Sequence, residues 1–127
     1  MATVELTADD FEKTVTAPGI TLVDFWAGWC GPCRQFAPVF DKASEANEDV
    51  TFAKVDTDAE QALAGAAGIT SIPTLMAFRD GVLVFSQPGA LPGHALDQVI
   101  TAVRELDMDE IHAKIAAQHA DADATAR

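Results

Sequence analysis

The segment Trp29–Cys33 reads Trp-Cys-Gly-Pro-Cys and holds the only two cysteines of the 127-residue chain. It follows a run of apolar and β-favouring residues, 20–27, and precedes a stretch in which apolar residues recur at helical spacing. A Cys-x-x-Cys pair between a strand and a helix is typical of a dithiol that cycles with its disulfide. This segment therefore predicts a buried strand, a tight turn that carries both cysteines, and a helix that begins at Cys33 or just before it.

The two cysteines are expected to differ in role. At the start of the helix, Cys30 lies beside unpaired backbone N–H groups and the positive end of the helix dipole, and both favour its thiolate. Cys33 lies one turn later, close enough to form a disulfide and farther from the exposed end. We therefore expect Cys30 to be the nucleophile and Cys33 to be the resolving thiol.

Two other uses of the cysteine pair have less support in the sequence. A purely structural disulfide gains little from so short a loop, because the entropy that it removes from the unfolded chain falls with loop size. A zinc site needs two more ligands, and the only histidines, His94, His112 and His119, lack the paired spacing of a zinc module. We expect no metal site.

Composition limits the classes of partner. With 20 acidic and 8 basic residues the net charge is −12, which argues against nucleic acid or an anionic membrane as a partner. The same charge is expected to serve solubility rather than one specific basic partner. No segment reaches the length of a membrane span, and the first residues lack the basic and apolar parts of a secretory signal. We expect a cytoplasmic monomer, unless a leader has been removed.

The remaining pattern predicts an α/β fold with a central mixed sheet and helices on both faces. Thr7 and Asp10 resemble a capping pair for a short helix with Phe11 and Val15. A second apolar run, 50–55, predicts a strand parallel to the first, followed by an alanine-rich helix that Asp56 or Asp58 can cap and Gly68 can end.

The second half is expected to be antiparallel. Residues 75–78 and 82–85 read as a hairpin with its turn at Asp80-Gly81, and a last helix follows with an apolar face from Leu96 to Leu106. Beyond residue 107, Met108, Ile111 and Ile115 form a weak apolar stripe that predicts a short helix, and the end from about Gln118 is expected to fray. We interpret residues 1–107 as one domain and residues 108–127 as a surface appendage rather than a functional arm.

Several motifs together resemble the thioredoxin family, over about residues 3–107. They are the Trp-Cys-Gly-Pro-Cys segment, an apolar strand with Asp24 and Trp26 before it, Pro38 inside the next helix, and Ile72-Pro73-Thr74 further along the chain. The resemblance implies a thioredoxin fold. It also implies that this chain reduces protein disulfides by dithiol exchange, without a bound cofactor, and is recycled by a separate thioredoxin reductase.

Asp24 is a carboxylate in an otherwise apolar strand, where desolvation raises a pKa and lets the group carry a proton near neutral pH. In the family that the chain resembles, the matching Asp lies behind the second cysteine and assists its deprotonation, which assigns this role to Asp24 for Cys33. Lys54 matches a lysine that neighbours this Asp in the family. The alternatives are a solvated Asp24 at the strand edge and an ordinary lysine whose stem lies along the surface.

The resemblance also implies a substrate surface. In the family the proline that matches Pro73 is cis and faces the cysteines, so that the backbone of Ile72 can pair with an extended substrate segment. An apolar platform is expected around it, formed by Trp29, Gly31, Pro32, Ile72, Gly89 and Ala90. Trp29 in a core or turn role is the alternative.

Two rival functions remain open at this point. A disulfide oxidase or isomerase is disfavoured by Gly31-Pro32, because relatives with oxidising roles usually carry a histidine there, which stabilises the reduced state. A binding module in which redox cycling is incidental would keep its activity without the cysteines. Arg34, Pro88 and the entry to the last helix at 92–94 depart from the family pattern, which puts details of partner contact in doubt.

Overall fold

The computed structural model describes residues 2–125, and only their backbone from residue 119 onward. Its centre is a five-stranded mixed sheet in the order β1-β3-β2-β4-β5. β1, β3 and β2 run parallel, whereas β4 and β5 pair antiparallel. This confirms the expected mixed sheet and the hairpin; the strands are β1 (Thr3–Glu5), β2 (Ile20–Trp26), β3 (Thr51–Asp56), β4 (Thr74–Arg79) and β5 (Val82–Pro88).

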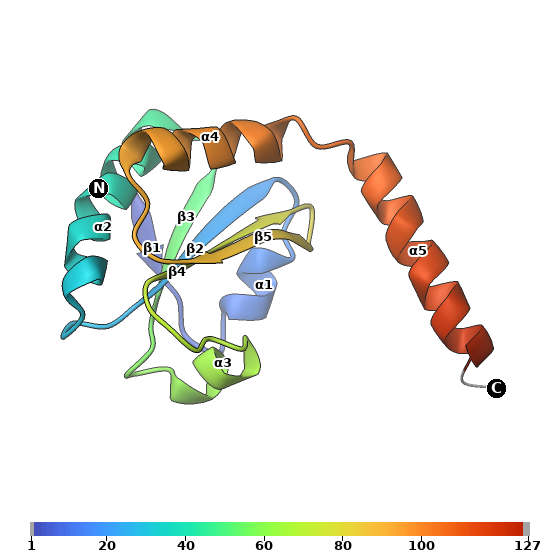
Figure 1. Cartoon of the computed structure of the whole chain (residues 1–127), viewed down its shortest axis with the longest axis horizontal. Coiled ribbons are helices and arrows are strands. Elements are labelled where there is room, and N and C mark those ends of the chain that lie inside the picture. Colours follow the sequence, from blue (N-terminus) through green and yellow to red (C-terminus); the bar gives the residue numbers. More distant parts are fainter. Residues whose placement is uncertain (1, 126–127) are drawn as a thin grey trace.

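Helices cover both faces of the sheet (Figure 1). Phe36 and Phe40 of α2 and Leu96 of α4 form one core with Leu22 of β2, while α1 and the region of α3 pack against a second core on the opposite face. The helices are α1 (Phe11–Val15), α2 (Gly31–Ala46), α3 (Gln61–Ala66), α4 (Gly93–Arg104) and α5 (Met108–Thr125).

β2 is buried on both faces, as its nearly continuous apolar sequence predicts. Leu22 belongs to the core under α2 and α4, and Val23 and Phe25 belong to the core on the other face. Because side chains alternate along a strand, Asp24 lies on the same face as Leu22, under α2 and α4. A charge-bearing residue thus occupies the centre of the sheet, where only hydrophobic side chains would be expected.

The turns follow the sequence closely, with two differences. Asp80 and Gly81 both have positive φ, at 51° and 83°, as a two-residue hairpin turn requires, and Gly68 with φ 73° follows α3. The prediction that Asp56 or Asp58 caps the start of α3 is wrong, because its N-cap is Glu60. The Asp56 carboxylate instead accepts the backbone N–H groups of Asp58 and Ala59, and this bonding shapes the turn before the helix. The three-residue strand β1 was not predicted.

α5 is longer than the sequence predicted. It runs for 18 residues to Thr125, past the expected tail from Gln118, in a stretch without glycine or proline and rich in alanine. The Asp107 carboxylate caps its start by accepting the Glu110 N–H at 3.1 Å. Met108 is buried at the base, and the rest of the helix extends away from the sheet (Figure 1). Residues 126–127 of the expected tail lie outside the described residues.

Candidate active site

The cysteine pair lies where β2 leads into α2, at the C-terminal end of a central strand. Cys30 is the N-cap of α2, and its Sγ accepts the backbone N–H of Cys33 at 3.2 Å. The two residues are joined by a disulfide, with their Cα atoms 5.2 Å apart. The helix start therefore presents a backbone N–H to Cys30 Sγ, and a contact of this kind favours a thiolate once the disulfide is reduced.

The two sulfur-bearing residues differ in what they face rather than in how much they are exposed. Their exposed fractions are 4% for Cys30 and 3% for Cys33, so both are buried. Cys30 lines an open hollow of about 590 Å³. Cys33 lines a different cavity, of about 100 Å³, together with Trp26 and Lys54. A disulfide brought by a substrate can therefore approach Cys30 from the open side.

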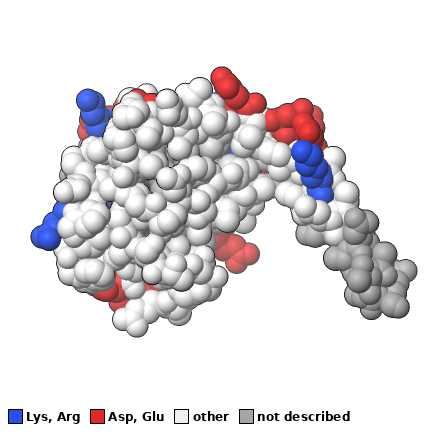
Figure 2. Space-filling model, in the orientation of Figure 1, with Lys and Arg blue, Asp and Glu red and all other residues white. Residues whose placement is uncertain are grey.

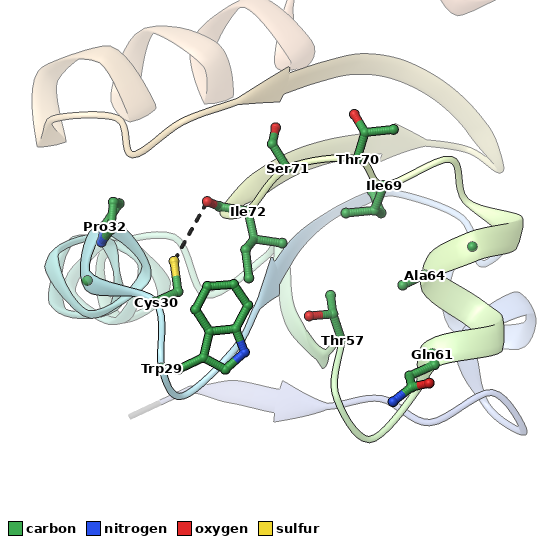
Figure 3. A pocket seen from close by; sticks show the side chains of 12 residues that line it. Trp29, Cys30, Pro32, Thr57, Gln61, Ala64, Ile69, Thr70, Ser71 and Ile72 are labelled. Carbon is green, nitrogen blue, oxygen red and sulfur yellow. Dashed lines mark hydrogen bonds between the residues drawn. The ribbon is translucent and has the colours of Figure 1, made fainter.

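The open hollow lies between the start of α2, α3 and the segment before β4 (Figure 3). Cys30 Sγ lies 3.6 Å from the carbonyl oxygen of Ile72, and the Ile72–Pro73 peptide bond is cis, as the resemblance implied. The Trp29 side chain forms one wall; the residue is 68% exposed and its indole N–H donates to Asp58 Oδ1 at 3.3 Å. The surface beside Cys30 thus combines an aromatic ring with a backbone acceptor.

The expected platform is brought together in part. Trp29, Gly31, Pro32 and Ile72 line the hollow, while Gly89 and Ala90 are not among its lining residues. Gly89 instead contacts Pro73, because its backbone N–H donates to the Pro73 carbonyl at 2.7 Å. The φ angle of Gly89 is 101°. Pro73 itself is fully buried.

Sequence reasoning missed the polar part of this hollow. None of the polar residues that line it, Thr57, Gln61, Thr70 and Ser71, belongs to a motif. Thr57, however, directly follows β3, and residues after the carboxyl ends of parallel strands often form the site in α/β folds. That signal could have identified Thr57, although not the residues of α3 or of the segment before β4.

Asp24, on the face of β2 that α2 covers, has an exposed fraction of 0%, and neither carboxylate oxygen has a hydrogen-bond partner. This burial raises the pKa of Asp24 to about 7, since desolvation penalises the charged form more than the nearby Lys54 favours it. Lys54 is the cross-strand partner of Asp24, and its Nζ lies 5.0 Å from the centroid of the Trp26 ring. The alternative of a solvated Asp24 at a strand edge is therefore wrong.

Two further features concern ligands and membranes. Among the side chains that the structure describes, no group of three or more from His, Cys, Asp and Glu is placed to hold a metal ion. None of the helices that the structure describes is long and apolar enough to cross a bilayer.

A cysteine that begins a helix and borders an open hollow, a nearby second cysteine that forms its disulfide, and a βαβ scaffold define a thiol-disulfide oxidoreductase. Comparison with known proteins agrees, since the sequence model of the family Thioredoxin matches residues 2–102. The chain belongs to the thioredoxin family.

Two bacterial relatives illustrate the match. The chain is 58% identical over 121 residues to the putative thioredoxin 2 of Streptomyces coelicolor, covering 95% of this chain and 90% of that protein. It is 40% identical over 101 residues to the thioredoxin of Bacillus subtilis, covering 79% and 96%. The first match must extend into α5, because 95% coverage leaves only a few residues of the chain outside it.

Solved structures agree with the fold. The thioredoxin of Malassezia sympodialis superposes with a TM-score of 0.73 at 33% identity, covering 80% of this chain and 93% of that one. The thioredoxin of Plasmodium falciparum gives a TM-score of 0.72 at 31% identity, covering 79% and 97%. The central mixed sheet with its flanking helices is therefore the thioredoxin fold.

Proposed function

We propose that Cys30 is the nucleophile and Cys33 the resolving thiol in the reduction of protein disulfides. The observation that carries this assignment is that Cys30 borders the large open hollow, whereas Cys33 does not line that hollow and borders a smaller cavity. The helix start supports the same order, because its N–H groups favour a thiolate at Cys30.

The exchange proceeds in two steps. The Cys30 thiolate attacks one sulfur of the substrate disulfide, the substrate S–S bond breaks, and its other sulfur leaves as a thiolate that takes up a proton. Cys33 then loses its proton and attacks Cys30 Sγ, which breaks the mixed disulfide and releases the second substrate sulfur. The substrate gains two electrons and two protons, and the protein is left with the Cys30–Cys33 disulfide.

Asp24 is proposed to accept the proton that Cys33 loses, and the positive charge of Lys54 is proposed to stabilise the carboxylate of Asp24 before it takes up that proton. Its buried position and a pKa of about 7 support this role, because a group with a pKa near the working pH can both take up and release a proton. Lys54 limits the penalty of the charged form, since its ammonium is the nearest opposite charge across the strands.

The substrate is proposed to lie across the hollow as an extended segment. The backbone of Ile72, held before cis-Pro73 and beside Cys30, offers groups with which such a segment can pair as an added strand. Trp29, Gly31 and Pro32 would form the apolar contact, and Gly89 and Ala90 would lie at the end of the segment. Such a surface would bind the main chain of the substrate rather than particular side chains, which suits varied protein substrates.

A separate thioredoxin reductase is proposed to return the electrons, with no cofactor bound to this chain. We also propose a cytoplasmic monomer that binds neither nucleic acid nor membrane. The net charge of −12 supports this, and Lys and Arg are scattered rather than gathered into a patch on the face shown in Figure 2.

The domain is proposed to end near residue 107, with residues 108–127 as an appendage. The family match ends at residue 102, and α5 extends away from the sheet in Figure 1. Truncation after Asp107 should leave the rate of disulfide reduction within about twofold of the full chain, because no site residue lies beyond it. A loss of tenfold or more would make α5 a functional arm.

Reductase-coupled reduction of a model protein disulfide tests the function. The full chain should consume the nicotinamide cofactor of the reductase in proportion to the disulfide supplied. A double Cys30→Ser, Cys33→Ser variant should consume none. If that variant kept full biological activity in cells, the fold would serve as a binding module and the proposal would fail.

A further inference from the structure

Three charged residues form a row across the parallel part of the sheet. Glu5 of β1 pairs in register with Lys54 of β3, and Lys54 pairs in register with Asp24 of β2. Register partners on neighbouring strands point to the same face of a sheet. The row therefore places Lys54 between two carboxylates, one at the edge of the sheet and one at its centre.

The two ends of the row differ in their access to water. Asp24 is fully buried and lacks hydrogen bonds, whereas Glu5 is exposed on the edge strand. β1 is held beside β3 by the Leu6 N–H, which donates to the Lys54 carbonyl at 2.8 Å. The distance from Glu5 to Lys54 is thus fixed by strand pairing rather than by a flexible loop.

Lys54 is committed to neither carboxylate. Among the residues that the structure describes, no ion pair within 4.0 Å joins Lys54 to Glu5 or to Asp24. Its ammonium lies instead over the Trp26 ring, 5.0 Å from the centroid. Its charge interacts with both Glu5 and Asp24, so a change in the charge of one carboxylate alters how strongly Lys54 stabilises the other.

We propose that Glu5 is a positioning residue for proton transfer, which through Lys54 sets the pH at which the buried Asp24 releases its proton. The proposal rests on the proposed role of Asp24 in the resolution step. It extends the catalytic apparatus to an exposed side chain at the far edge of the sheet, where salt or a bound partner can change the charge that Asp24 experiences.

The direction follows from electrostatics. A negative Glu5 attracts the Lys54 ammonium and opposes a second negative charge at Asp24, so both effects hold the proton on Asp24. The other groups that face Asp24 are Asp41 of α2, whose charge also raises its pKa, and the uncharged Leu75, its partner on β4. Partial burial raises the pKa of Glu5 itself, the Lys54 ammonium opposes that rise, and the charge of Asp56 on β3 adds to it.

The size of the effect follows from the spacing. Two strand spacings separate Glu5 from Asp24 by about 10 Å, and Coulomb interaction over that distance corresponds to about 0.3 to 1 pH unit for effective dielectric constants between those of water and a protein surface. Because Glu5 is exposed, its share of the interaction should weaken with salt, as the Debye length falls from about 10 Å at 0.1 M to about 3 Å at 1 M.

The test is a titration of the Asp24 carboxyl by ¹³C NMR in the oxidised full chain. Glu5→Gln should lower the midpoint by about 0.3 to 1 pH unit in low salt, and by less in 1 M salt. Glu5→Asp, which keeps the charge, should stay closer to wild type. The matched control is Glu12→Gln, because Glu12 is an exposed carboxylate on α1, which covers the opposite face. An unchanged midpoint in Glu5→Gln, or an equal shift in Glu12→Gln, overturns the proposal.

A second measurement separates this proposal from the role of Asp24 itself. The rate at which Cys33 resolves a mixed disulfide is recorded against pH for wild type and Glu5→Gln, and its midpoint should move down together with the NMR midpoint. If the NMR midpoint moves and the rate profile does not, the coupling of Glu5 to Asp24 stands, and Asp24 loses its role as proton acceptor. If neither moves, Glu5 has no such influence.

Discussion

The two sides of the Cys30–Cys33 disulfide are built for different tasks. On the Cys30 side the hollow is open and its lining is uncharged, with Trp29 and the Ile72 carbonyl next to the sulfur. On the Cys33 side a cavity of about 100 Å³ is lined by Lys54 and Arg34, and the buried Asp24 lies under the same helix. An uncharged open surface suits the varied substrates proposed for Cys30, whereas the smaller cavity with charged residues around it suits the proton transfer proposed for Asp24.

The difference arises from the local sequence around one strand–helix junction. Trp29 precedes the first cysteine and, as the residue outside the helix cap, points its ring toward solvent, whereas Cys33 lies in the first turn of α2 and faces the sheet. Asp24 and Trp26 precede the junction by even steps along β2, so their side chains share the face that α2 covers. Asp24 and Trp26 of β2 thus lie on the Cys33 side of the disulfide, whereas the turn with Trp29 forms the open Cys30 side.

The largest effect is expected from replacing the two cysteines one at a time. With Cys33→Ser, Cys30 should still attack a substrate and accumulate a stable mixed disulfide, while turnover stops because nothing resolves it. With Cys30→Ser, no adduct should form, because Cys33 faces only the small cavity. Mass spectrometry of the trapped species, with the double serine variant as control, measures both.

Trapping of substrate through Cys33 in Cys30→Ser would contradict the comparison of the two sides. It would mean that the cavity behind the disulfide opens widely enough to admit a protein substrate. Equal trapping by the two single variants would show that a substrate reaches Cys33 as easily as Cys30, so that the roles of the two thiols do not follow from their access to substrate.

The next effect concerns Asp24, on the Cys33 side of the disulfide. Asp24→Asn keeps the shape of the side chain but cannot accept a proton, so resolution by Cys33 should slow by about 10²-fold or more, in the range typical of a lost general base. The initial attack by Cys30 should change much less. Single-turnover kinetics, which separate adduct formation from resolution, provide the measurement. Equal slowing of both steps would place Asp24 outside the proton transfer.

The same buried carboxylate should reduce stability in a pH-dependent way. Its folded-state pKa of about 7 exceeds the unfolded value near 3.9, so the native state binds the extra proton, and the penalty grows as pH rises from about 4 to about 7. The shift corresponds to at most on the order of 4 kcal/mol. Asp24→Ala should therefore be more stable than wild type at neutral pH, less the cost of the cavity it leaves.

Denaturant titrations at pH 5 and pH 8 measure this gain. It should be larger at pH 8, where the wild-type carboxylate is charged, than at pH 5, where it is mostly protonated. A variant that is less stable than wild type at pH 8 would contradict the interpretation of Asp24 as a buried proton carrier, and so would a gain that is equal at both pH values.

The sequence predicted the site better where side chains follow motifs than where the fold brings distant segments together. Asp24 stood out because a carboxylate interrupts an apolar run, and the structure buries it completely. Thr70 and Ser71 carry no such signal, since they line the hollow only because the fold brings the segment before β4 beside the start of α2. Thr57 could have been found only from its place directly after β3.

The same contrast holds for the fold. β2 and the Asp80-Gly81 turn follow from local patterns of burial and positive φ. β1 did not, because a three-residue strand becomes recognisable only through its pairing with β3. The length of α5 was underestimated because its apolar stripe is short, although helix propensity continues to Thr125. Glu5 gained significance only when the register placed it beside Lys54.

A smaller effect is expected on the open side. Trp29→Ala removes a ring that is 68% exposed and therefore contributes little to the core, so stability should stay within about 0.5 kcal/mol of wild type. The loss of the contact surface should raise the KM for a protein disulfide by about 10-fold, with a smaller change in kcat. Leu83→Ala is the matched control, since Leu83 is exposed on β5 and does not line the hollow. If both variants raise KM equally, the hollow is not the substrate surface.

The smallest effect is expected from placing a charge on the uncharged side. Pro32→His adds an imidazole beside Cys30, and its protonated form stabilises the Cys30 thiolate and hence the reduced state, which makes the pair more oxidising. A gain of about 1 kcal/mol, as for a cation near a partly exposed anion, corresponds to roughly 20 mV, given that 30 mV equals about 1.4 kcal/mol. Because an unperturbed histidine titrates near pH 6.5, the increase in potential should be larger at pH 6 than at pH 8. Equilibration with glutathione at both pH values measures it, and Pro32→Asn, which removes the proline without adding a charge, isolates the electrostatic part. An equal rise in the asparagine variant would assign the effect to loss of the proline ring, and the open side would then owe its redox behaviour to backbone rigidity and not to the absence of charge.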